Sequence, residues 1–402
     1  MTTTAEARTG SDWRWATAVH LSVVAVLVLV VWQSSVHLTH REEGLLPRAT
    51  TLDHGDGVIG PWLYWDTKYY VEISEHGYRA EDRAVFEAGG ETAAAFFPGY
   101  PLVVAAVGML GVSTGFALVG VTFLAGLGAT IVLHRLFTLQ MSRAASRRAT
   151  LAIALFPWSY FLVAAAYPEA LFLFLAGAAF LLVEHDRPIA AGLLAALASA
   201  TRLIGIGLVL GLAIRVAERR GALRFEGWRP RLDRSLLRRR DAGVLVGASG
   251  LAAWMVVCWV RYGDPLAFST AQRGWSQGFG LRSWLKLGLI DQLQHNQDRF
   301  FVTRLLLQGL VMVLFALALP AVWRRFGAGY GTYAVVAVAL PLLGSANFAS
   351  NGRFALMAFP VFAVAGERLA RERAPGDWVV LAMSASALVA VASLWGRGYW
   401  MG

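Results

Sequence analysis

The sequence consists largely of apolar runs of about twenty residues, separated by shorter segments that carry arginine. Runs such as 16–36, 116–136 and 301–322 are long enough for a helix to cross the ~30 Å hydrocarbon core of a bilayer. Of the 402 residues, 57% are apolar and 15% are charged, against roughly a quarter charged in an ordinary soluble domain. These features argue against a soluble domain, a disordered chain or a disulfide-rich secreted module, and they predict an all-α polytopic membrane protein.

The basic residues indicate which ends of these runs face the cytoplasm. Residues 215–240, most of which form a predicted cytoplasmic loop at 217–241, hold ten arginines against three acids. A pI near 10 is also typical of nucleic-acid binding. Here the basic residues lie between apolar runs, so we assign them to membrane orientation and to contact with membrane lipids, and we expect no nucleic-acid partner.

The opposite charge marks an outer loop. Residues 37–95 hold eleven acids and five bases, a net charge of −6, which is expected on the extracytoplasmic side. The predicted loop extends over 37–114, because the apolar run 97–111 would span only ~22 Å as a helix and is therefore predicted to be re-entrant or juxtamembrane. A second extracytoplasmic loop is predicted at 261–300.

Residues 190–216 are too short for two full crossings, yet both of their ends must be cytoplasmic. We therefore predict a hairpin of two short helices with its apex near Thr201 and Arg202. Counting these two, the sequence predicts about eleven transmembrane helices in a single integral-membrane domain of residues 1–402, with the N-terminus in the cytoplasm.

Four charged residues converge on the predicted outer side. Asp66 lies in an aromatic segment of the first loop, Glu169 in an outer turn, Arg202 at the hairpin apex and Arg353 after the last outer turn. Because all four face one compartment, we predict a single outward-facing site.

Each of these residues has a functional and a structural interpretation. Aromatic neighbours would raise the pKa of Asp66, which suits a general base, but the segment is also compatible with an interfacial aromatic belt. Arg202 could bind a phosphate or pair with Glu169 or Asp66. Glu169 could orient a substrate or be a solvated turn residue, and Arg353 could bind a ligand or extend to the interface.

The sequence contains no signature for other common chemistries. It has no Walker loop, dinucleotide fingerprint or Gly-x-Ser-x-Gly elbow. Cys258 is the only cysteine and lies in an apolar run, which excludes an intramolecular disulfide and a cysteine-based metal site. His76 has no partner at metal-ligand spacing. We therefore predict no metal site, although the carboxylates leave dependence on a divalent metal open.

Five motifs follow one another along the chain: Trp-Asp-Thr-Lys-Tyr-Tyr (65–70) with Ile-Ser-Glu-His-Gly-Tyr (73–78), Phe-Phe-Pro-Gly-Tyr-Pro (96–101), Ala-Tyr-Pro-Glu-Ala-Leu-Phe (166–172), Ser-Ala-Thr-Arg-Leu-Ile-Gly (199–205), and Arg-Phe (353–354) with Phe-Pro (359–360). Together they resemble the PIG-V family of mannosyltransferases, within the GT-C glycosyltransferase superfamily. The sequence departs from the family pattern at Pro168, where threonine or serine is usual, and at Phe354, where tyrosine is common. Neither departure removes a charged group.

The resemblance implies a GT-C fold and an inverting transfer of a sugar, most simply mannose, from a polyprenyl-phosphate donor. By this analogy Asp66 is the general base, Glu169 orients the acceptor or assists the base, and Arg202 and Arg353 bind the donor phosphate. Further substrate- or phosphate-binding residues are expected within the same motifs: Trp65, Lys68, Tyr69, Tyr70, His76, Tyr100 and Tyr167.

The acceptor and the compartment are less constrained by the resemblance. The acceptor could be a glycolipid, a cell-wall glycan or a protein. Rich use of arginine, alanine and glycine suggests a GC-rich bacterial genome, and hence the plasma membrane with an extracytoplasmic active site.

Two other functions fit the sequence less well. A transporter or lipid flippase should have inverted repeats with paired broken helices, and only one short hairpin is predicted. A non-catalytic membrane scaffold would leave the convergence of Asp66, Glu169 and Arg202 unexplained.

Overall fold

The computed structural model describes most of the chain, and side chains from residue 12 onward: residues 3–38, 57–79, 81–226, 229–275, 277–295, 298–371 and 376–402. Residues 39–56 of the predicted first outer loop therefore lie outside the described residues.

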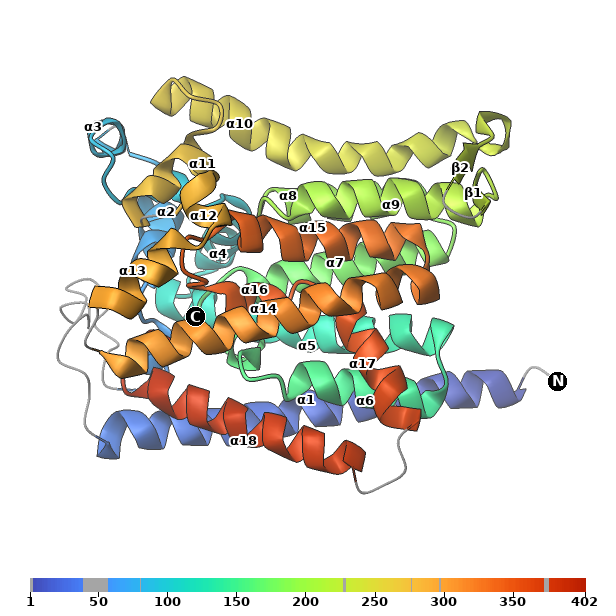
Figure 1. The fold of residues 1–402 in the computed structure, drawn as a ribbon, viewed down its shortest axis with the longest axis horizontal. Coiled ribbons are helices and arrows are strands. Elements are labelled where there is room, and N and C mark those ends of the chain that lie inside the picture. The colour runs from blue at the N-terminus through green and yellow to red at the C-terminus, as the bar shows by residue number, and fades with distance from the viewer. Residues whose placement is uncertain are drawn as a thin grey trace.

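Most of the longer helices run side by side along the long axis of the molecule (Figure 1). They are α1 (Thr3–His37), α5 (Thr114–Gln140), α6 (Arg143–Ala154), α7 (Glu169–Glu184), α8 (Pro188–Ser199), α9 (Gly205–Arg219), α10 (Ser249–Tyr262), α14 (Arg299–Phe326), α15 (Ala328–Gly344), α17 (Phe359–Arg371) and α18 (Gly376–Gly396).

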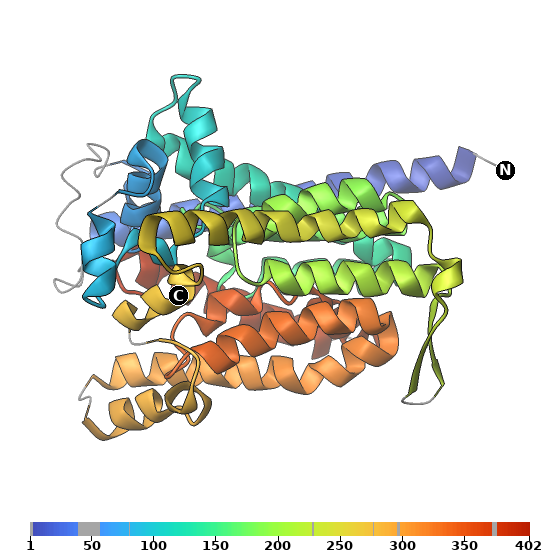
Figure 2. The ribbon, with the colours of Figure 1, turned by 90° about the horizontal axis from the view of Figure 1, so that it is seen from above.

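Short helices gather at the end of the bundle opposite the N-terminus, on the left of Figures 1 and 2. They are α2 (Thr67–His76), α3 (Asp82–Glu87), α4 (Gly99–Gly108), α11 (Ala267–Thr270), α12 (Leu281–Trp284), α13 (Leu287–His295) and α16 (Asn351–Ala355), with the 3-10 turns η1 (Gly60–Trp62), η2 (Ala93–Ala95) and η6 (Ala271–Trp275). The two predicted outer loops thus lie at the same end.

The opposite end carries the arginine-rich segment. The strands β1 (Leu223–Glu226) and β2 (Arg229–Leu232) pair antiparallel and project from the bundle (Figure 2). The 3-10 helices η4 (Arg234–Leu236) and η5 (Arg239–Ala248) follow, and η5 leads directly into α10.

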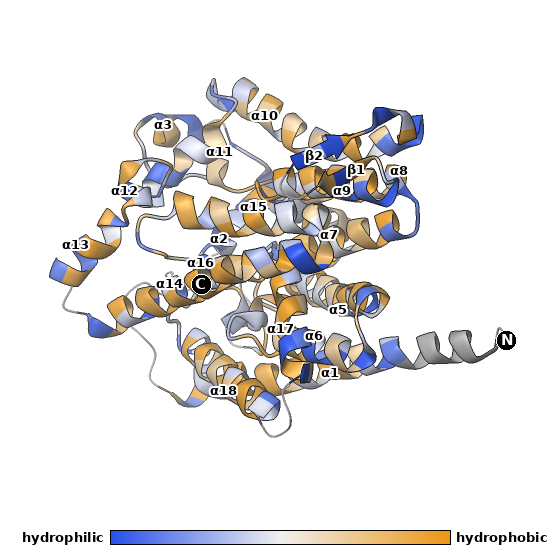
Figure 3. Cartoon of the chain, turned by 45° about the vertical axis from the view of Figure 1, so that its right-hand side comes forward, coloured by the Kyte–Doolittle hydropathy of each residue, from blue (hydrophilic) through white to orange (hydrophobic). Residues whose placement is uncertain are grey.

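The helices are rich in apolar residues (Figure 3), and many large apolar side chains on them are exposed. Among the described residues, five helices are long and apolar enough to cross a membrane: Asp12–His37, Thr114–Gln140, Arg239–Tyr262, Arg299–Phe326 and Gly376–Gly396. The prediction of an all-α polytopic membrane protein is confirmed, whereas the number eleven is not fixed by the structure.

The two short apolar runs form short helices, and the re-entrant placement of the first stays a prediction. α4 has ten residues and so extends ~15 Å, about half of what a crossing needs. The run 190–216 forms the two short helices α8 and α9, and its turn contains Thr201 and Arg202.

The apolar stretch of residues 150–166 does not form one continuous helix. α6 ends at Ala154, and the chain continues through Pro157 into the 3-10 turn η3 (Ser159–Leu162). Pro157 disfavours continuation of the helix, because proline lacks the amide donor and its ring clashes with the preceding turn. The aromatic residues that follow are buried inside the bundle, which explains why hydropathy alone suggests a span.

Two close contacts at glycines hold α4 against the α8–α9 turn and α16 against the segment before η3. The Gly99 amide donates to the Ala200 carbonyl at 2.7 Å, and a Cβ on Gly99 would lie 2.8 Å from that oxygen. A Cβ on Gly352 would lie 2.1 Å from the Trp158 indole. The start of α4 is therefore fixed against the hairpin apex, and α16 against the turn before η3.

Candidate active site

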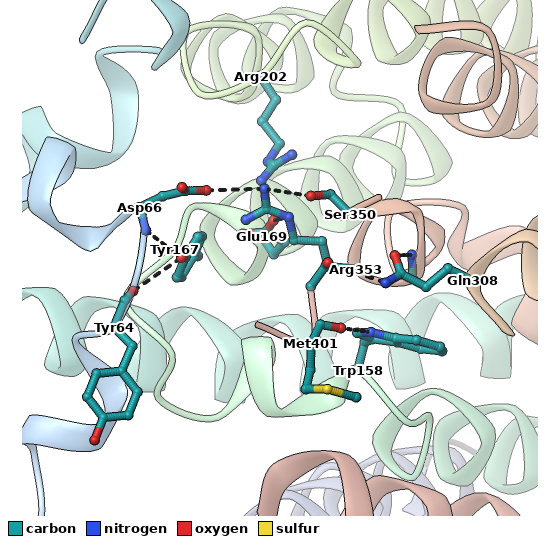
Figure 4. Close-up of polar contacts among 12 residues, drawn as sticks. Tyr64, Asp66, Trp158, Tyr167, Glu169, Arg202, Gln308, Ser350, Arg353 and Met401 are labelled. Carbon is teal, nitrogen blue, oxygen red and sulfur yellow. Dashed lines mark hydrogen bonds and ion pairs between the residues drawn. The ribbon is translucent and has the colours of Figure 1, made fainter. Parts of the chain in front are cut away.

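Four charged side chains from distant parts of the sequence meet at the end of the bundle that carries the outer loops (Figure 4). Arg202 forms an ion pair with Glu169. The Arg353 Nε lies 3.6 Å from Glu169 Oε1, and its Nη2 lies 3.4 Å from Asp66 Oδ2. The charges alternate in sign and sum to zero, so each has an opposite charge beside it.

The position of Asp66 is fixed by its backbone. Trp65 adopts a left-handed conformation with φ of 64°, which turns the chain sharply before α2. The Tyr167 hydroxyl accepts the Asp66 amide at 2.9 Å and donates to the Tyr64 carbonyl at 3.2 Å. Tyr167 thus ties the first outer loop to the turn that precedes Glu169.

The Asp66 carboxyl group is only partly enclosed. Its side chain keeps 20% of its surface exposed and lines a cavity. Burial raises the pKa of Asp66, the nearby Glu169 carboxylate adds to that rise, and the Arg353 guanidinium opposes it. A carboxyl group with a raised pKa accepts a proton more readily, as a general base must.

Glu169 is the first residue of α7 and is fully buried. Its carboxylate benefits from the positive N-terminal end of the helix and from the two guanidinium groups. Burying a charge costs several kcal/mol unless it is paired, so Glu169 and its two arginines depend on one another.

Arg353 is also enclosed by aromatic rings. Its guanidinium carbon lies 5.0 Å from the ring centres of both Tyr167 and Trp400, and its Nη2 lies 3.4 Å from Ser350 Oγ. These contacts hold the guanidinium at one place without neutralising it.

The cavity has a volume of about 630 Å³ and is lined by both outer loops and by α14, α15 and the α8–α9 turn. The structure places seven of the sequence-predicted site residues on its wall: Trp65, Asp66, Lys68, Tyr69, Tyr70, Arg202 and Arg353.

Four predicted residues do not line the cavity. Glu169 and Tyr167 lie behind its wall and contact residues that do. Tyr100 is buried and donates to the Leu118 carbonyl at 2.8 Å, so it packs α4 against α5. His76 is exposed at the end of α2. Because Tyr100 and His76 both lie away from the cavity wall, the structure does not support the prediction that they contact the substrate.

Several cavity residues were missed by sequence reasoning. Arg304 on α14 lines the cavity and donates to the Trp400 carbonyl, and Trp400 lines it as well. An arginine three residues into the apolar run 301–322 was a signal that could have found this position, since charges inside such runs are costly. Glu91 and Trp275, from the two outer loops, carry no comparable signal.

The site can combine three chemical tasks. The Asp66 carboxylate reaches the cavity, guanidinium groups suited to a phosphate lie beside it, and aromatic rings cover much of the wall. Within the described residues, no group of three or more histidine, cysteine, aspartate or glutamate side chains is placed to hold a metal ion.

Comparison with known families identifies the chain's relatives. The model of the family described as mannosyltransferase (PIG-V) matches residues 17–217, half of the chain. The chain belongs to this family. The matched range includes Asp66, Glu169 and Arg202, and Arg353 lies beyond it, so the family resemblance of the motifs is confirmed for the first half of the chain.

Two relatives with similar sequences are also mannosyltransferases. A GPI alpha-1,6-mannosyltransferase 2 from Cricetulus griseus is 35% identical in an alignment 175 residues long, which covers 39% of this chain and 32% of that protein. The protein of the same name from Mus musculus is 30% identical in an alignment 215 residues long, which covers 48% of this chain and 41% of that protein. The aligned regions thus cover well under half of the relatives' length.

Solved structures show more distant similarity. The crystal structure of ArnT from Cupriavidus metallidurans, bound to undecaprenyl phosphate, is 18% identical, with a TM-score of 0.47 over 90% of this chain and 62% of that one. The oligosaccharyltransferase of Archaeoglobus fulgidus in its apo form is 12% identical, with a TM-score of 0.44 over 95% and 56% of the two chains.

Proposed function

We propose that the chain is a membrane glycosyltransferase that moves mannose from a polyprenyl-phosphate donor to an acceptor hydroxyl, with inversion at the anomeric carbon. The observation that carries this proposal is the placement of Asp66, Arg202 and Arg353 on the wall of one cavity. Membership of the PIG-V mannosyltransferase family supports the same reaction class and the expected GT-C architecture.

In the proposed reaction, Asp66 removes the proton from the acceptor hydroxyl. The resulting oxygen attacks the anomeric carbon on the face opposite the lipid phosphate, and the carbon–oxygen bond to that phosphate breaks. A new glycosidic bond forms with inverted configuration, and the lipid leaves as its phosphate monoester. Arg202 and Arg353 stabilise the negative charge that develops on the phosphate.

Glu169 acts as a positioning residue in this scheme. It is fully buried behind the cavity wall, so it reaches the reaction through the two arginines that it holds. Tyr167 has a similar role, because its hydroxyl fixes the backbone of Asp66.

The remaining cavity residues provide contacts for the two substrates. Trp65, Lys68, Tyr69 and Tyr70 lie on the same short stretch of the first outer loop as Asp66 and line the cavity. We assign them to binding of the donor sugar, its phosphate and the acceptor. The donor enters from the membrane, and the acceptor is a glycolipid, a cell-wall glycan or a protein on the extracytoplasmic side of what we propose to be a bacterial plasma membrane.

A transfer assay tests the proposal. Purified protein in lipid nanodiscs is given radiolabelled polyprenyl-phosphate mannose with glycolipid, glycan and peptide acceptors, with and without a divalent metal and a chelator. We expect label in one acceptor class and an inverted anomeric configuration by NMR of the product. Counterflow of a solute or lipid with no transfer to any acceptor would instead support a transporter.

A further inference from the structure

The segment that follows α18 folds back into the wall of the cavity. α18 ends at Gly396, and the chain reverses at Gly398, whose positive φ of 78° suits glycine. The amide of Tyr399 donates back to a carbonyl in the last turn of α18, at 3.0 Å, and closes the reversal. Residues 399–402 thereby reach the site, and the Trp400 side chain lines the cavity.

The backbone of residues 400–402 is anchored to three other parts of the bundle, because each of its carbonyl groups accepts a hydrogen bond. The first bond comes from Arg304 on α14, the second from the Trp158 indole at 2.5 Å (Figure 4), and the third from the Ser350 amide at 3.2 Å. Anchors on three sides fix the path of this backbone, so its tryptophan has a defined place on the cavity wall.

The Trp400 indole contacts two residues of the proposed catalytic machinery. The guanidinium carbon of Arg353 lies 5.0 Å from its ring centre, and the ring of Trp65 lies 5.6 Å from it. Trp65 directly precedes Asp66 and adopts the left-handed conformation that turns the chain there. One side chain therefore contacts both the arginine assigned to the donor phosphate and the residue that turns the chain before the base.

The polar contacts of Arg353 are too long to hold it firmly by themselves. Its nitrogens lie 3.4 Å from oxygens of Asp66 and Ser350, and 3.6 Å from one of Glu169, whereas a strong charge-assisted bond measures about 2.7–2.9 Å. An aromatic ring attracts a guanidinium group without using its N–H donors, and tryptophan does so best. Contact with Trp400 can therefore hold the guanidinium while its donors remain available to a phosphate.

We infer that Trp400 is a positioning residue for the proposed transfer. It holds the Arg353 guanidinium where the donor phosphate is expected, and through Trp65 it supports the turn that places Asp66. This inference rests on the proposed function and adds to it a residue outside the motifs that resemble the family. Trp400 also lies beyond residues 17–217, the range that matches the family model.

Steady-state transfer tests this role, with the full chain in nanodiscs, labelled polyprenyl-phosphate mannose and the acceptor class found for the wild type. In Trp400→Ala we expect the donor KM to rise and kcat to fall, each about tenfold. Trp400→Phe keeps a ring, so both values should stay within threefold of the wild type. Unchanged kinetics in Trp400→Ala would overturn the inference.

The matched control is the neighbouring ring in the same segment. Tyr399 packs against Phe300 on α14, with ring centres 5.3 Å apart, and does not line the cavity. Tyr399→Ala should therefore change kcat and the donor KM less than twofold. A loss as large as that of Trp400→Ala would mean that the segment serves the fold only, and would also overturn the inference.

A double-mutant cycle shows whether Trp400 acts through Arg353. Adding Trp400→Ala to Arg353→Gln should change the donor KM less than twofold, because the guanidinium that the indole holds is already absent. A tenfold rise in both backgrounds would contradict the proposed coupling.

Thermal unfolding supplies a measurement that needs no transfer. The melting temperature should fall less in the double variant Trp400→Ala, Arg353→Gln than the sum of the two single effects, as expected for side chains in contact. Additive shifts would contradict a contact that holds Arg353. If Trp400→Ala does not fold, Trp400→Leu, which keeps apolar bulk without a ring, takes its place in both cycles. If the wild type transfers to no acceptor, the proposed function fails, and the unfolding cycle still decides whether Trp400 holds Arg353.

Discussion

At the scale of single residues, Arg202 has two possible roles. It pairs with the buried Glu169 and so contributes to stability, and it lines the cavity, where it could bind the donor phosphate. Arg202→Gln leaves a fully buried carboxylate short of one partner, and we expect a loss of about 3 kcal/mol or more in the free energy of unfolding. Adding Glu169→Gln removes the unpaired charge, so stability should recover. If Arg202 also binds the donor phosphate, the KM for the donor should remain at least tenfold raised in the double variant.

Thermal unfolding and donor kinetics of the single and double variants separate these two roles. Recovery of both stability and donor KM in the double variant would mean that Arg202 is a structural partner of Glu169 only.

Asp66 is the residue on which the proposed chemistry depends most. Asp66→Asn keeps the shape of the side chain and the hydrogen bond from the backbone amide to the Tyr167 hydroxyl, but it cannot act as a base, so we expect kcat to fall by about 10²–10⁴ while the donor KM changes little. The matched control is Asp82→Asn in the same loop, outside the cavity. Rates of single-turnover transfer measure the effect, and transfer at the wild-type rate in Asp66→Asn would exclude this residue as the base.

The pH dependence of transfer should report the Asp66 carboxyl group. Its pKa is raised by burial and lowered by Arg353, and the base acts only when deprotonated. Activity should therefore increase with pH through a limb that lies above the ordinary aspartate pKa of about 3.9. Arg353→Gln removes the cation, so the limb of the residual activity should move to higher pH, whereas Arg353→Lys keeps a charge and should move it less. A limb at the same pH in both variants would contradict this coupling.

At the scale of elements, the apolar runs and arginine clusters were enough to predict the main helices and the hairpin turn at Arg202. They do not show that the helix in the apolar stretch 150–166 ends at Ala154, because a buried irregular segment is as apolar as a membrane span and periodicity cannot separate the two. The charges of the site were predicted because each interrupts an apolar or aromatic segment. Glu91 and Trp275 were not, since their place on the cavity wall depends on the contact between two loops that are far apart in sequence.

The contact between α4 and the hairpin apex is an element-scale feature that can be tested with a matched pair of variants. A side chain at Gly99 would collide with the backbone of Ala200, two residues before Arg202, while a Cβ at Gly108 on the same helix meets nothing within 4 Å. We expect Gly99→Val to cost about 1–3 kcal/mol of stability and to raise the donor KM, because the apex must shift. Gly108→Val should leave the donor KM unchanged. Equal effects of the two variants, measured by thermal unfolding and donor kinetics, would show that α4 does not position Arg202.

At the scale of the whole molecule, charge and chemistry are separated along the helix axis. The arginine-rich hairpin β1–β2 projects from one end, and the cavity with Asp66, Arg202 and Arg353 lies at the other (Figures 1 and 2). Because arginine-rich segments stay on the cytoplasmic side, this separation predicts an extracytoplasmic active site. The net charge of the whole chain is +10, whereas the loop 37–95 at the cavity end carries −6, so the excess of basic residues lies elsewhere in the chain.

Cysteine labelling in intact cells tests this orientation. Cys258 is buried and can be replaced by alanine, after which single cysteines are introduced at the exposed positions Glu87, Ser113 and Ser235. An impermeant maleimide should label Glu87→Cys and Ser113→Cys in closed cells, because both lie on the outer side if α4 does not cross. It should label Ser235→Cys, beside the basic hairpin, only after permeabilisation. Ser113→Cys protected together with Ser235→Cys would make α4 part of a crossing, and labelling of Ser235→Cys alone in closed cells would place the proposed active site in the cytoplasm.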